Sequence, residues 1–379
     1  MIERFYTNNL ESLVIPNKVL IVYGPRQVGK TTLVESFLNT LDSSTNISVY
    51  RSTGENITTK EVLESSDFSK IIPFFESYKI IFIDEAQKIS NIGQGLKILV
   101  DQIPGIKIIA TGSSSFELSN KVGEPLVGRA KILILYPLSV LELIKNYGNG
   151  WVIENLENLL VYGGYPEVLN SSSNNQKVEY LNLIRDSYLY KDILELEKIK
   201  NSKKIFDLLR LLAFQVGNEV SIQELSKQLS MTRNLVEKYL DLLEKSFVII
   251  NLRGFSKNLR SEITKTSKYY FYDNGIRNAV IGNFNYLANR NDVGALWENF
   301  LFIERLKKQA YTGIHANNYF WRTWEQKELD FIEERDGKLF SFEFKYSKES
   351  VPKPKLFLET YPEATFELIN RDNFINFLT

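Results

Sequence analysis

Residues 24–31 read Gly-Pro-Arg-Gln-Val-Gly-Lys-Thr and fit the phosphate-binding pattern G-x-x-x-x-G-K-[ST]. A short apolar run, Val19–Tyr23, predicts a buried strand before this segment, and a helix is predicted from Thr32 to Leu41 after it. In such a loop the backbone N–H groups wrap phosphates, Lys30 reaches the β- and γ-phosphates, and the hydroxyl of Thr31 holds Mg²⁺. The predicted nucleotide-binding residues are Gly24, Pro25, Arg26, Gln27, Val28, Gly29, Lys30, Thr31 and Thr32.

Two further apolar stretches end in residues that suit phosphate chemistry. "YKIIFIDEAQKI" places Asp84 and Glu85 at the tip of a predicted strand. Asp84 suits Mg²⁺ and its bound water, and Glu85 suits the base that positions an attacking water. "GIKIIATGSSSFEL" ends in Thr111 and a serine cluster, of which Ser113 is the predicted γ-phosphate sensor, because open α/β sheets bind ligands at the carboxyl ends of their strands. Helix capping is the alternative role for the two acids.

A second candidate site lies near the end of the sequence, in "ELDFIEERDGKLFSFEFKYS". Asp336-Gly337 predicts a two-residue turn. Counting outward from it sets Asp330 opposite Glu343, with Lys345 on the same face. Two facing carboxylates repel each other, and a divalent cation would remove the repulsion, while the lysine could stabilise a developing phosphate charge. An ordinary charged surface hairpin is the alternative.

The helix predicted for "VGALWENFLFIERL" precedes this hairpin. Acids are seldom buried unless they are paired, so Glu298 in this apolar helix is a candidate metal ligand, with Glu304 as a weaker one. A helix with an acid, then an acid, then Glu-x-Lys resembles the restriction-endonuclease-like superfamily. The resemblance implies that the two acids and the lysine of the hairpin are catalytic, and that these acids and Glu298 hold a metal. Leu329 stands where such proteins usually have a proline.

The overall composition limits the remaining possibilities. Of 379 residues, 46 are Lys or Arg and 46 are Asp or Glu, so the chain has no overall basic field and a nucleic-acid site must be local. The sequence has no cysteine and one histidine, His315, which excludes disulfides and cysteine- or histidine-rich metal sites. The first residues do not predict a signal peptide, and no apolar run approaches the roughly 20 residues that span a membrane. We therefore expect a cytoplasmic protein without a membrane partner.

The middle of the chain predicts a helix-turn-helix followed by a wing. Ser221 and Glu224 can form a capping box for a short helix, and a second helix runs from Arg233 to about Lys245. The second helix carries no net charge, which is poor for a recognition helix. The strands "FVIINL" and "KYYFYD" form the predicted wing, whose basic residues are Arg253, Lys257, Arg260, Lys265 and Lys268, against Glu262 alone. DNA binding and a purely structural role both stay open.

The order of the nucleotide motifs resembles that of AAA-type and STAND-like ATPases. "GPRQVGKTT", "IIFIDEAQKI", "IIATGSSS" and "LVGRAKILILYPLSVLEL" look like a widespread prokaryotic family of AAA ATPases that carry a C-terminal domain of unknown function. "GGYPEVL" and "YLYKDIL" are also similar to that family. The resemblance implies ATP and Mg²⁺ as cofactors and places Arg129 where AAA proteins often have a catalytic arginine finger. A basic residue that merely enters the next strand is the alternative; a finger acting in trans would imply a homo-oligomer.

The predicted fold class is α/β with three domains. These are an AAA-type P-loop NTPase domain with a parallel sheet over residues 1–165, a helical and winged-helix domain over 166–275, and a restriction-endonuclease-like α/β domain over 276–379. The favoured function is an ATP-hydrolysing ATPase that acts on or with DNA, with a possible metal-dependent endonuclease activity. The alternative is a nucleotide-dependent regulatory switch whose nuclease-like domain is inactive and binds a partner. A small-molecule P-loop kinase would suit the first domain alone.

Overall fold

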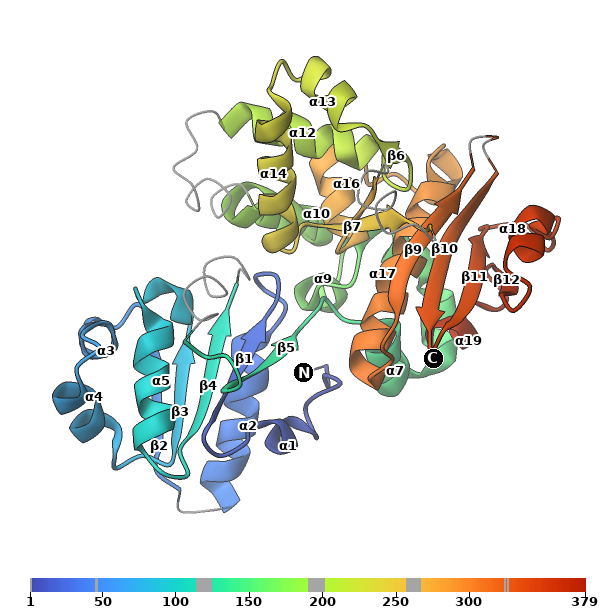
Figure 1. Ribbon diagram of the computed structural model, residues 1–379. Coiled ribbons are helices and arrows are strands. Elements are labelled where there is room, and N and C mark those ends of the chain that lie inside the picture. Colours follow the sequence, from blue (N-terminus) through green and yellow to red (C-terminus); the bar gives the residue numbers. More distant parts are fainter. Residues whose placement is uncertain are drawn as a thin grey trace. The chain divides into compact units, whose positions relative to one another are not determined.

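The computed structural model describes residues 2–44, 47–113, 125–189, 202–256, 267–323, 325 and 327–379. The chain divides into two compact units (Figure 1): Met1–Tyr136 with Lys245–Phe247, and Pro137–Glu244 with Val248–Thr379. Each unit has its own sheet, of five strands in the first and seven in the second. The division into three domains, with boundaries after residues 165 and 275, stays a prediction.

The first unit is a parallel sheet flanked by helices. Its strands are β1 (Lys18–Tyr23), β2 (Val49–Thr53), β3 (Ile80–Asp84), β4 (Lys107–Gly112) and β5 (Ala130–Ile134). Its helices are α1 (Leu10–Leu13), α2 (Lys30–Ser44), α3 (Ile57–Glu64), α4 (Phe68–Phe75), α5 (Ile92–Gln102) and the 3₁₀ turn η1 (Ala86–Lys88). All strand pairs are parallel, in the order β2-β3-β4-β1-β5.

The central strands of this sheet are buried along almost their whole length. Five consecutive residues of β1 and of β4, and four of β3, are buried, as expected for parallel strands covered on both faces. Helices α2 and α5 pack against the sheet, and α3 and α4 pack against α5. In the strand order, β3, β4 and β1 are neighbours, so their carboxyl ends meet at one edge.

The second unit combines helices with a mixed sheet. Its helices are α7 (Val140–Glu154), α8 (Leu156–Tyr162), α9 (Pro166–Asn170), α10 (Asn174–Leu183), the π-helix η2 (Ile184–Leu189), α12 (Ser202–Phe214), α13 (Ile222–Gln228), α14 (Arg233–Lys245), α16 (Asn274–Ile281), η3 (Leu287–Asn289), α17 (Val293–Thr312), α18 (Lys355–Thr360) and α19 (Phe374–Leu378). Its strands are β6 (Glu219–Val220), β7 (Ile249–Gly254), β8 (Ser267–Phe271), β9 (Asn317–Arg322), β10 (Glu328–Arg335), β11 (Lys338–Phe344) and β12 (Thr365–Ile369). No helix among the described residues is long and apolar enough to cross a membrane.

The strand order of the second sheet is β12-β11-β10-β9-β7-β8-β6. Strands β9, β10 and β11 form an antiparallel meander, and β12 joins β11 in parallel. Strand β7 pairs in parallel with β9, with Arg253 beside Tyr319 and Gly254 beside Phe320. The two strands predicted as a wing, β7 and β8, pair antiparallel and are therefore part of the same sheet as the predicted nuclease-like strands. Helix α17 packs on β8 and β11.

The β10–β11 hairpin has the predicted register. Arg335 lies opposite Lys338 and Phe331 opposite Phe342, as counting from the turn predicts. The turn residues Asp336 and Gly337 both have positive φ, of 49° and 74°, which is typical of the two-residue turns that match the twist of a hairpin.

On its other edge β10 is irregular. Its pairing with β9 shifts register between Leu329 and Ile332, so that β10 carries one extra residue there. A bulge of this kind re-aims a side chain and often lies next to a functional site. Asp330 lies within it, and its carboxylate accepts a hydrogen bond from the backbone N–H of Phe344 at 2.8 Å.

The helix-turn-helix segment forms the predicted helices, α13 and α14. The hydroxyl of Ser221 accepts a hydrogen bond from the N–H of Glu224 at 3.3 Å and caps α13, as the sequence predicts. The designation as a DNA-binding winged helix stays a prediction.

Candidate functional site

The phosphate loop connects β1 to α2. Gly24 has a φ of 147°, and a Cβ atom there would lie 2.0 Å from the carbonyl oxygen of Leu135, so only glycine fits. Lys30 begins α2, two residues earlier than predicted, and is 6% exposed. Its Nζ donates to the carbonyl oxygens of Gly24 (2.9 Å) and Pro25 (2.8 Å). The loop therefore curls around the ammonium group of its own lysine.

The remaining predicted loop residues occupy positions that suit a phosphate cradle. Gln27 is exposed with a φ of 63°, Gly29 has a φ of 94°, and Val28 is buried. Arg26 is half-buried, and Thr31 and Thr32 are exposed on the first turn of α2. Successive N–H groups in such a turn form an anion-binding concavity, to which the positive end of α2 adds.

A residue outside the motif, Arg4, braces this loop. It is 7% exposed, and its guanidinium donates to the carbonyl oxygens of Val28 and Tyr136, both at 2.6 Å. Nothing in the local pattern around Arg4 signals this role, because the contacts join segments 24 and 132 residues away.

The acid at the end of β3 lies beside the loop. The hydroxyl of Thr31 donates to the carboxylate of Asp84, with both oxygens at 3.0 Å. The hydroxyl of Thr111, from the end of β4, is also hydrogen-bonded to Asp84 and accepts from the backbone N–H of Glu85 at 3.1 Å. Thr111 is fully buried, so it fixes both acids relative to the sheet. The structure thus brings together residues from β3, β4 and α2.

Glu85 and Ser113 are linked by a residue that the motif analysis did not select. Glu85 has left-handed backbone angles, with φ 48° and ψ 44°, which a non-glycine residue rarely adopts. The side-chain amide of Gln87, 3% exposed, donates to the carboxylate of Glu85 and to the hydroxyl of Ser113 at 3.1 Å. The predicted base and the predicted sensor therefore share one hydrogen-bond donor. The signal available in the sequence was the position of this glutamine, two residues after Glu85.

Arg129 lies at the opposite end of the sheet from the phosphate loop within this unit. Its carbonyl oxygen accepts from the N–H of Val19, near the start of β1, whereas the loop follows the end of β1. Its guanidinium is paired with Asp101 at 2.7 Å, and this contact raises the pKa of Arg129. The structure does not bring Arg129 to the nucleotide residues of its own chain.

The second candidate site is an acid–lysine cluster in the seven-stranded sheet. We use this name for Lys268, Glu298, Glu328, Asp330, Glu343 and Lys345. The ammonium of Lys345 lies 2.6 Å from Glu343 and 3.3 Å from Asp330, so the hairpin places these three side chains together as predicted. The ammonium of Lys268, from β8, contacts the carboxylates of Glu328 and Glu298, the latter at 3.3 Å. Lys345 thus lies between Glu343 and Asp330, and Lys268 lies between Glu298 and Glu328.

The electrostatics of the cluster reflect burial and mutual repulsion. Burial raises the pKa of Glu298 to about 7, with Lys268 opposing and Asp330 adding to the rise. Burial and the charge of Asp330 also raise the pKa of Glu343. Burial would lower the pKa of Lys268, but the surrounding carboxylates outweigh it and raise that pKa. The lysines are therefore firmly charged and partly neutralise their neighbours.

The predicted metal ligands of this cluster do not form a ready cation site. Among the described residues, no group of three or more His, Cys, Asp or Glu side chains is placed to hold a metal ion. Glu298 is near enough to Asp330 to feel its charge, whereas Glu304, the weaker candidate, belongs to another cluster. The metal assignment of Glu298, Asp330 and Glu343 stays a prediction, and the ammonium groups now between these acids do not fit it.

The structure corrects one detail of the predicted wing. Lys268 was counted as a basic residue available to DNA, but it is 1% exposed and engaged by acids. Ion pairs with acids on α17 and β10, which are distant in the sequence, accompany this burial, and local sequence does not reveal them. Arg253 is exposed, while Lys257, Arg260, Glu262 and Lys265 lie outside the described residues.

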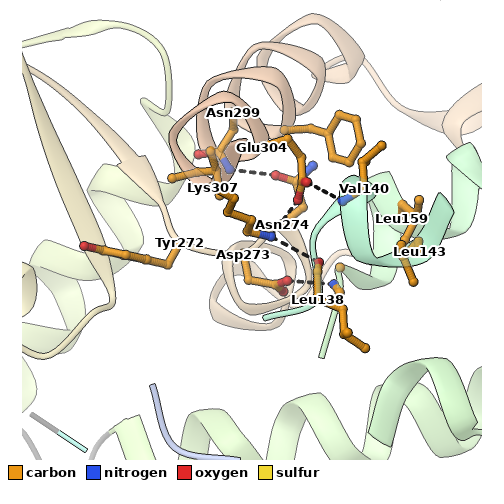
Figure 2. A pocket seen from close by; sticks show the side chains of 14 residues that line it. Leu138, Val140, Leu143, Leu159, Tyr272, Asp273, Asn274, Asn299, Glu304 and Lys307 are labelled. Carbon is orange, nitrogen blue, oxygen red and sulfur yellow. Dashed lines mark hydrogen bonds and ion pairs between the residues drawn. The ribbon is translucent and has the colours of Figure 1, made fainter. Parts of the chain in front are cut away.

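A small enclosed cavity lies elsewhere in the second unit (Figure 2). Its volume is about 20 Å³, room for roughly one water molecule. Glu304 accepts from the N–H of Val140 at 2.6 Å and pairs with Lys307 at 2.6 Å, and Asp273 accepts from the N–H of Gly164 at 2.8 Å. Burial raises the pKa of Asp273 to about 6. The small size of the cavity and these hydrogen-bonded acids indicate that this region has a structural role.

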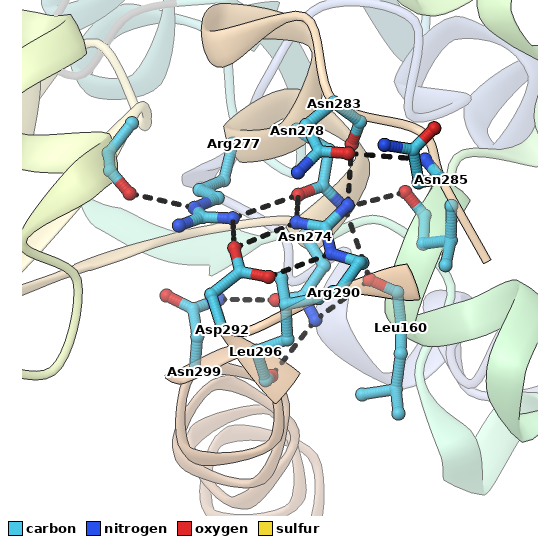
Figure 3. Close-up of polar contacts among 12 residues, drawn as sticks. Leu160, Asn274, Arg277, Asn278, Asn283, Asn285, Arg290, Asp292, Leu296 and Asn299 are labelled. Carbon is cyan, nitrogen blue, oxygen red and sulfur yellow. Dashed lines mark hydrogen bonds and ion pairs between the residues drawn. The ribbon is translucent and has the colours of Figure 1, made fainter. Parts of the chain in front are cut away.

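A second buried polar network joins α16 to the segments around it (Figure 3). Asn278 donates to the carbonyl oxygen of Val161 at 2.8 Å, and Arg290 donates to Asn278 at 2.9 Å and to Asp292 at 2.8 Å. Arg277 also pairs with Asp292, and the two arginines lower the pKa of Asp292 to about 2. These polar groups have partners within the chain, some close in sequence and some distant, so we interpret the network as structural.

Three protein-family models match successive parts of the chain. Residues 16–144 match an AAA domain. Residues 153–286 and 293–370 match two domains of unknown function, DUF8612 and DUF4143. The first match covers the phosphate loop, Asp84, Glu85 and Ser113, and supports an AAA-type nucleotide-binding ATPase domain.

Curated relatives extend this similarity along the chain without naming an activity. An uncharacterized protein of Methanocaldococcus jannaschii is 27% identical over 340 residues, which covers 86% of this chain and 74% of the relative. An uncharacterized protein of Mycobacterium tuberculosis is 27% identical over 337 residues, covering 86% and 70%. AMPPCP-bound DnaA from Aquifex aeolicus is a structural match at 16% identity and a TM-score of 0.32, over 63% of this chain and 84% of that one. A TM-score of this size supports no functional argument.

Proposed function

We propose that this chain is a Mg²⁺-dependent AAA-type ATPase that binds and hydrolyses ATP. The observation that carries the proposal is the meeting of Thr31, Asp84 and Thr111 beside the lysine-centred loop. Three strands and one helix converge there, at the edge where parallel sheets bind ligands.

The residues at this edge fit Mg²⁺. The Thr31 hydroxyl and the Asp84 carboxylate are hard oxygen donors, already within 3.0 Å of each other. They would hold the ion directly or through water, and the bound ion would neutralise phosphate charge.

The chain's own groups have distinct roles in this proposal. Lys30 would exchange its carbonyl contacts for the β- and γ-phosphate oxygens. Glu85 would accept a hydrogen bond from the attacking water and take its proton. Ser113 would contact the γ-phosphate, and its shared donor Gln87 would couple that contact to Glu85.

The test is ATP hydrolysis by the purified full chain with and without Mg²⁺. Wild type should release phosphate only with the metal, and Asp84→Asn should lose this activity. Asp42→Asn, which changes an acid paired with Arg51 on the surface of the same unit, is the matched control. Equal turnover in Asp84→Asn and wild type would overturn the assignment.

Arg129 fits the proposal only as a finger that acts in trans within a homo-oligomer. Neither Arg129→Ala nor Lys30→Ala should hydrolyse ATP alone. A mixture should regain activity, because a Lys30→Ala subunit still supplies Arg129 to its neighbour. A mixture without activity, or full activity of Arg129→Ala alone, would exclude this role.

A second candidate role is a nucleotide-dependent switch with an inactive nuclease-like half. The order α17, β9, β10, β11, α18 and β12 supports the restriction-endonuclease-like prediction. The burial of Lys268 between Glu298 and Glu328 favours an inactive centre over an endonuclease. Incubation of plasmid and linear DNA with Mg²⁺ or Mn²⁺ should leave both uncut. Cleavage that is lost in Glu343→Gln would instead establish the endonuclease, and a gel-shift assay with the same DNA separates binding from cutting.

A further inference from the structure

Lys268 occupies an unusual position for a lysine. It lies on β8 with 1% of its side chain exposed, and its ammonium group lies 5.3 Å from the ring centre of Phe320. A lysine is almost never buried to this extent unless it is paired. Its partners come from two other elements, Glu298 from α17 and Glu328 from β10.

The acids around Lys268 are held in a fixed arrangement. Glu298 also accepts a hydrogen bond from the hydroxyl of Tyr270 at 2.6 Å, and Asp330 accepts from the N–H of Phe344 at 2.8 Å. Glu328 is further approached by Arg322 at 4.0 Å. The carboxylates would repel one another without a cation among them, and the Lys268 ammonium supplies one positive charge with three donors.

A divalent ion and this ammonium compete for the same oxygens. An ion bound to Glu298 and Glu328 would lie close to the ammonium, where two positive charges repel strongly because little water screens them. Lys268 could not move its ammonium group into solvent without leaving its buried contact with Phe320. With this ammonium group among them, the acids of the described residues form no set of three that is placed to hold a metal.

We propose that Lys268 is a built-in cation that occupies the metal position of the acid–lysine cluster and prevents divalent metal binding there. Replacing it with a neutral side chain of similar length converts the cluster into a divalent-cation site that uses Glu298, Glu328 and Asp330. This inference goes beyond the ATPase function and does not depend on it.

The test is Mn²⁺ binding to the full chain in the absence of nucleotide. Binding is measured as the decrease of the paramagnetic resonance signal of free Mn²⁺. All proteins carry Asp84→Asn, so that the phosphate-loop edge does not contribute. Lys268→Met should bind one Mn²⁺ about 10-fold or more tightly than the parent. Adding Glu328→Gln to Lys268→Met should abolish the gain.

Lys307→Met is the matched control, because it removes another buried lysine that pairs with a buried glutamate, Glu304. It should gain no Mn²⁺ site. A folded Lys268→Met protein, judged by circular dichroism and a cooperative melt, that binds no more Mn²⁺ than its parent would overturn the proposal. If Lys268→Met does not fold, Mn²⁺ binding to the parent protein decides the question. One Mn²⁺ bound by the parent, and no longer bound after Asp330→Asn, would overturn the proposal. A parent that binds no Mn²⁺ would support it.

Discussion

Two buried lysines, one in each compact unit, show how different environments prepare the same side chain for different tasks. Lys30 is 6% exposed and donates to two neutral carbonyl oxygens of its own loop. Lys268 is 1% exposed and contacts two carboxylates from other elements. Carbonyl dipoles hold an ammonium group in place without cancelling its charge, whereas carboxylates cancel it.

The difference indicates which region is prepared for a ligand. At the phosphate loop, a lysine, a helix N-terminus and successive N–H groups favour an incoming anion. In the acid–lysine cluster opposite charges already contact one another within the chain. Both regions look like catalytic motifs in sequence, but the partners of the charged groups separate them.

The largest expected effect concerns the base in the first region. Glu85→Gln should lower the ATP turnover number by ~1000-fold, about 4 kcal/mol in activation free energy, while ATP affinity stays within a few-fold of wild type. The reason is that glutamine keeps the side-chain shape but cannot take a proton from water. Steady-state phosphate release and equilibrium nucleotide binding measure the two quantities. Glu61→Gln, an exposed acid of the same unit, is the control; unchanged turnover in Glu85→Gln would mean that the base lies elsewhere.

The buried ion pair Arg305–Glu333 in the second unit should control stability and not ATP turnover. Glu333 is 0% exposed and accepts from Arg305 at 2.5 and 2.9 Å and from Gln309 at 2.8 Å. Glu333→Gln should lower the free energy of unfolding by about 3 kcal/mol, because it leaves a buried guanidinium without its counter-charge. Urea unfolding followed by fluorescence measures the change. The adjacent, half-buried Glu334→Gln should cost far less; equal costs would contradict the distinction between the two acids.

Removing Lys30 tests the ligand side of the comparison directly. Lys30→Ala should weaken ATP binding by ~30- to 100-fold, the size expected for hydrogen bonds from a charged donor to phosphate. Its melting temperature without nucleotide should change little, because the hydrogen bonds to Gly24 and Pro25 end on neutral carbonyl oxygens and their loss breaks no ion pair. Isothermal calorimetry and a thermal melt give the two values, with Lys60→Ala as control, a partly exposed lysine of α3 that lies 3.9 Å from Glu64. A large loss of stability with unchanged affinity would reverse the roles assigned to the two lysines.

The smallest effect is a pH dependence of stability that arises from Asp273, which lines the small cavity of the second unit. Burial raises the pKa of this acid from 3.8 to about 6. The native state therefore binds this proton more tightly than the unfolded state does. The stability that the bound proton contributes is complete below about pH 4 and is lost as the pH rises through 6.

Between pH 4.5 and 6, wild type should lose about 1.5 kcal/mol relative to Asp273→Asn, which has no proton to release. Urea unfolding at a series of pH values measures the slope, and Asp372→Asn, an exposed acid, should follow wild type. Parallel curves for wild type and Asp273→Asn would show that Asp273 titrates normally.

Local patterns in the sequence predicted the parts of these regions that are set by short-range geometry. The phosphate loop follows from eight consecutive residues, and the hairpin register follows from the Asp336-Gly337 turn. The meeting of Thr111 with Asp84 follows from the rule that parallel strands share their carboxyl edge.

The features that were missed depend on contacts between distant segments. Arg4 reaches Val28 from the start of the chain, and β7 pairs with β9 across 65 or more residues. The burial of Lys268 depends on that pairing, because it places β8 in the same sheet as β10, whose Glu328 contacts the Lys268 ammonium group. A charge count along the wing could not distinguish this lysine from the exposed Arg253.

The pairing of β7 with β9 also determines how the chain can be shortened. A fragment that starts at residue 276 would lack β7 and Phe255, whose N–H donates to the carbonyl oxygen of Phe320 at 2.6 Å. Phe255 packs in a core cluster with Trp321, Leu329, Ile332 and Phe357. Without it, β9 would present an unpaired edge beside exposed apolar side chains, the combination that promotes strand-to-strand aggregation. The smallest soluble piece of this half should therefore begin upstream of β7.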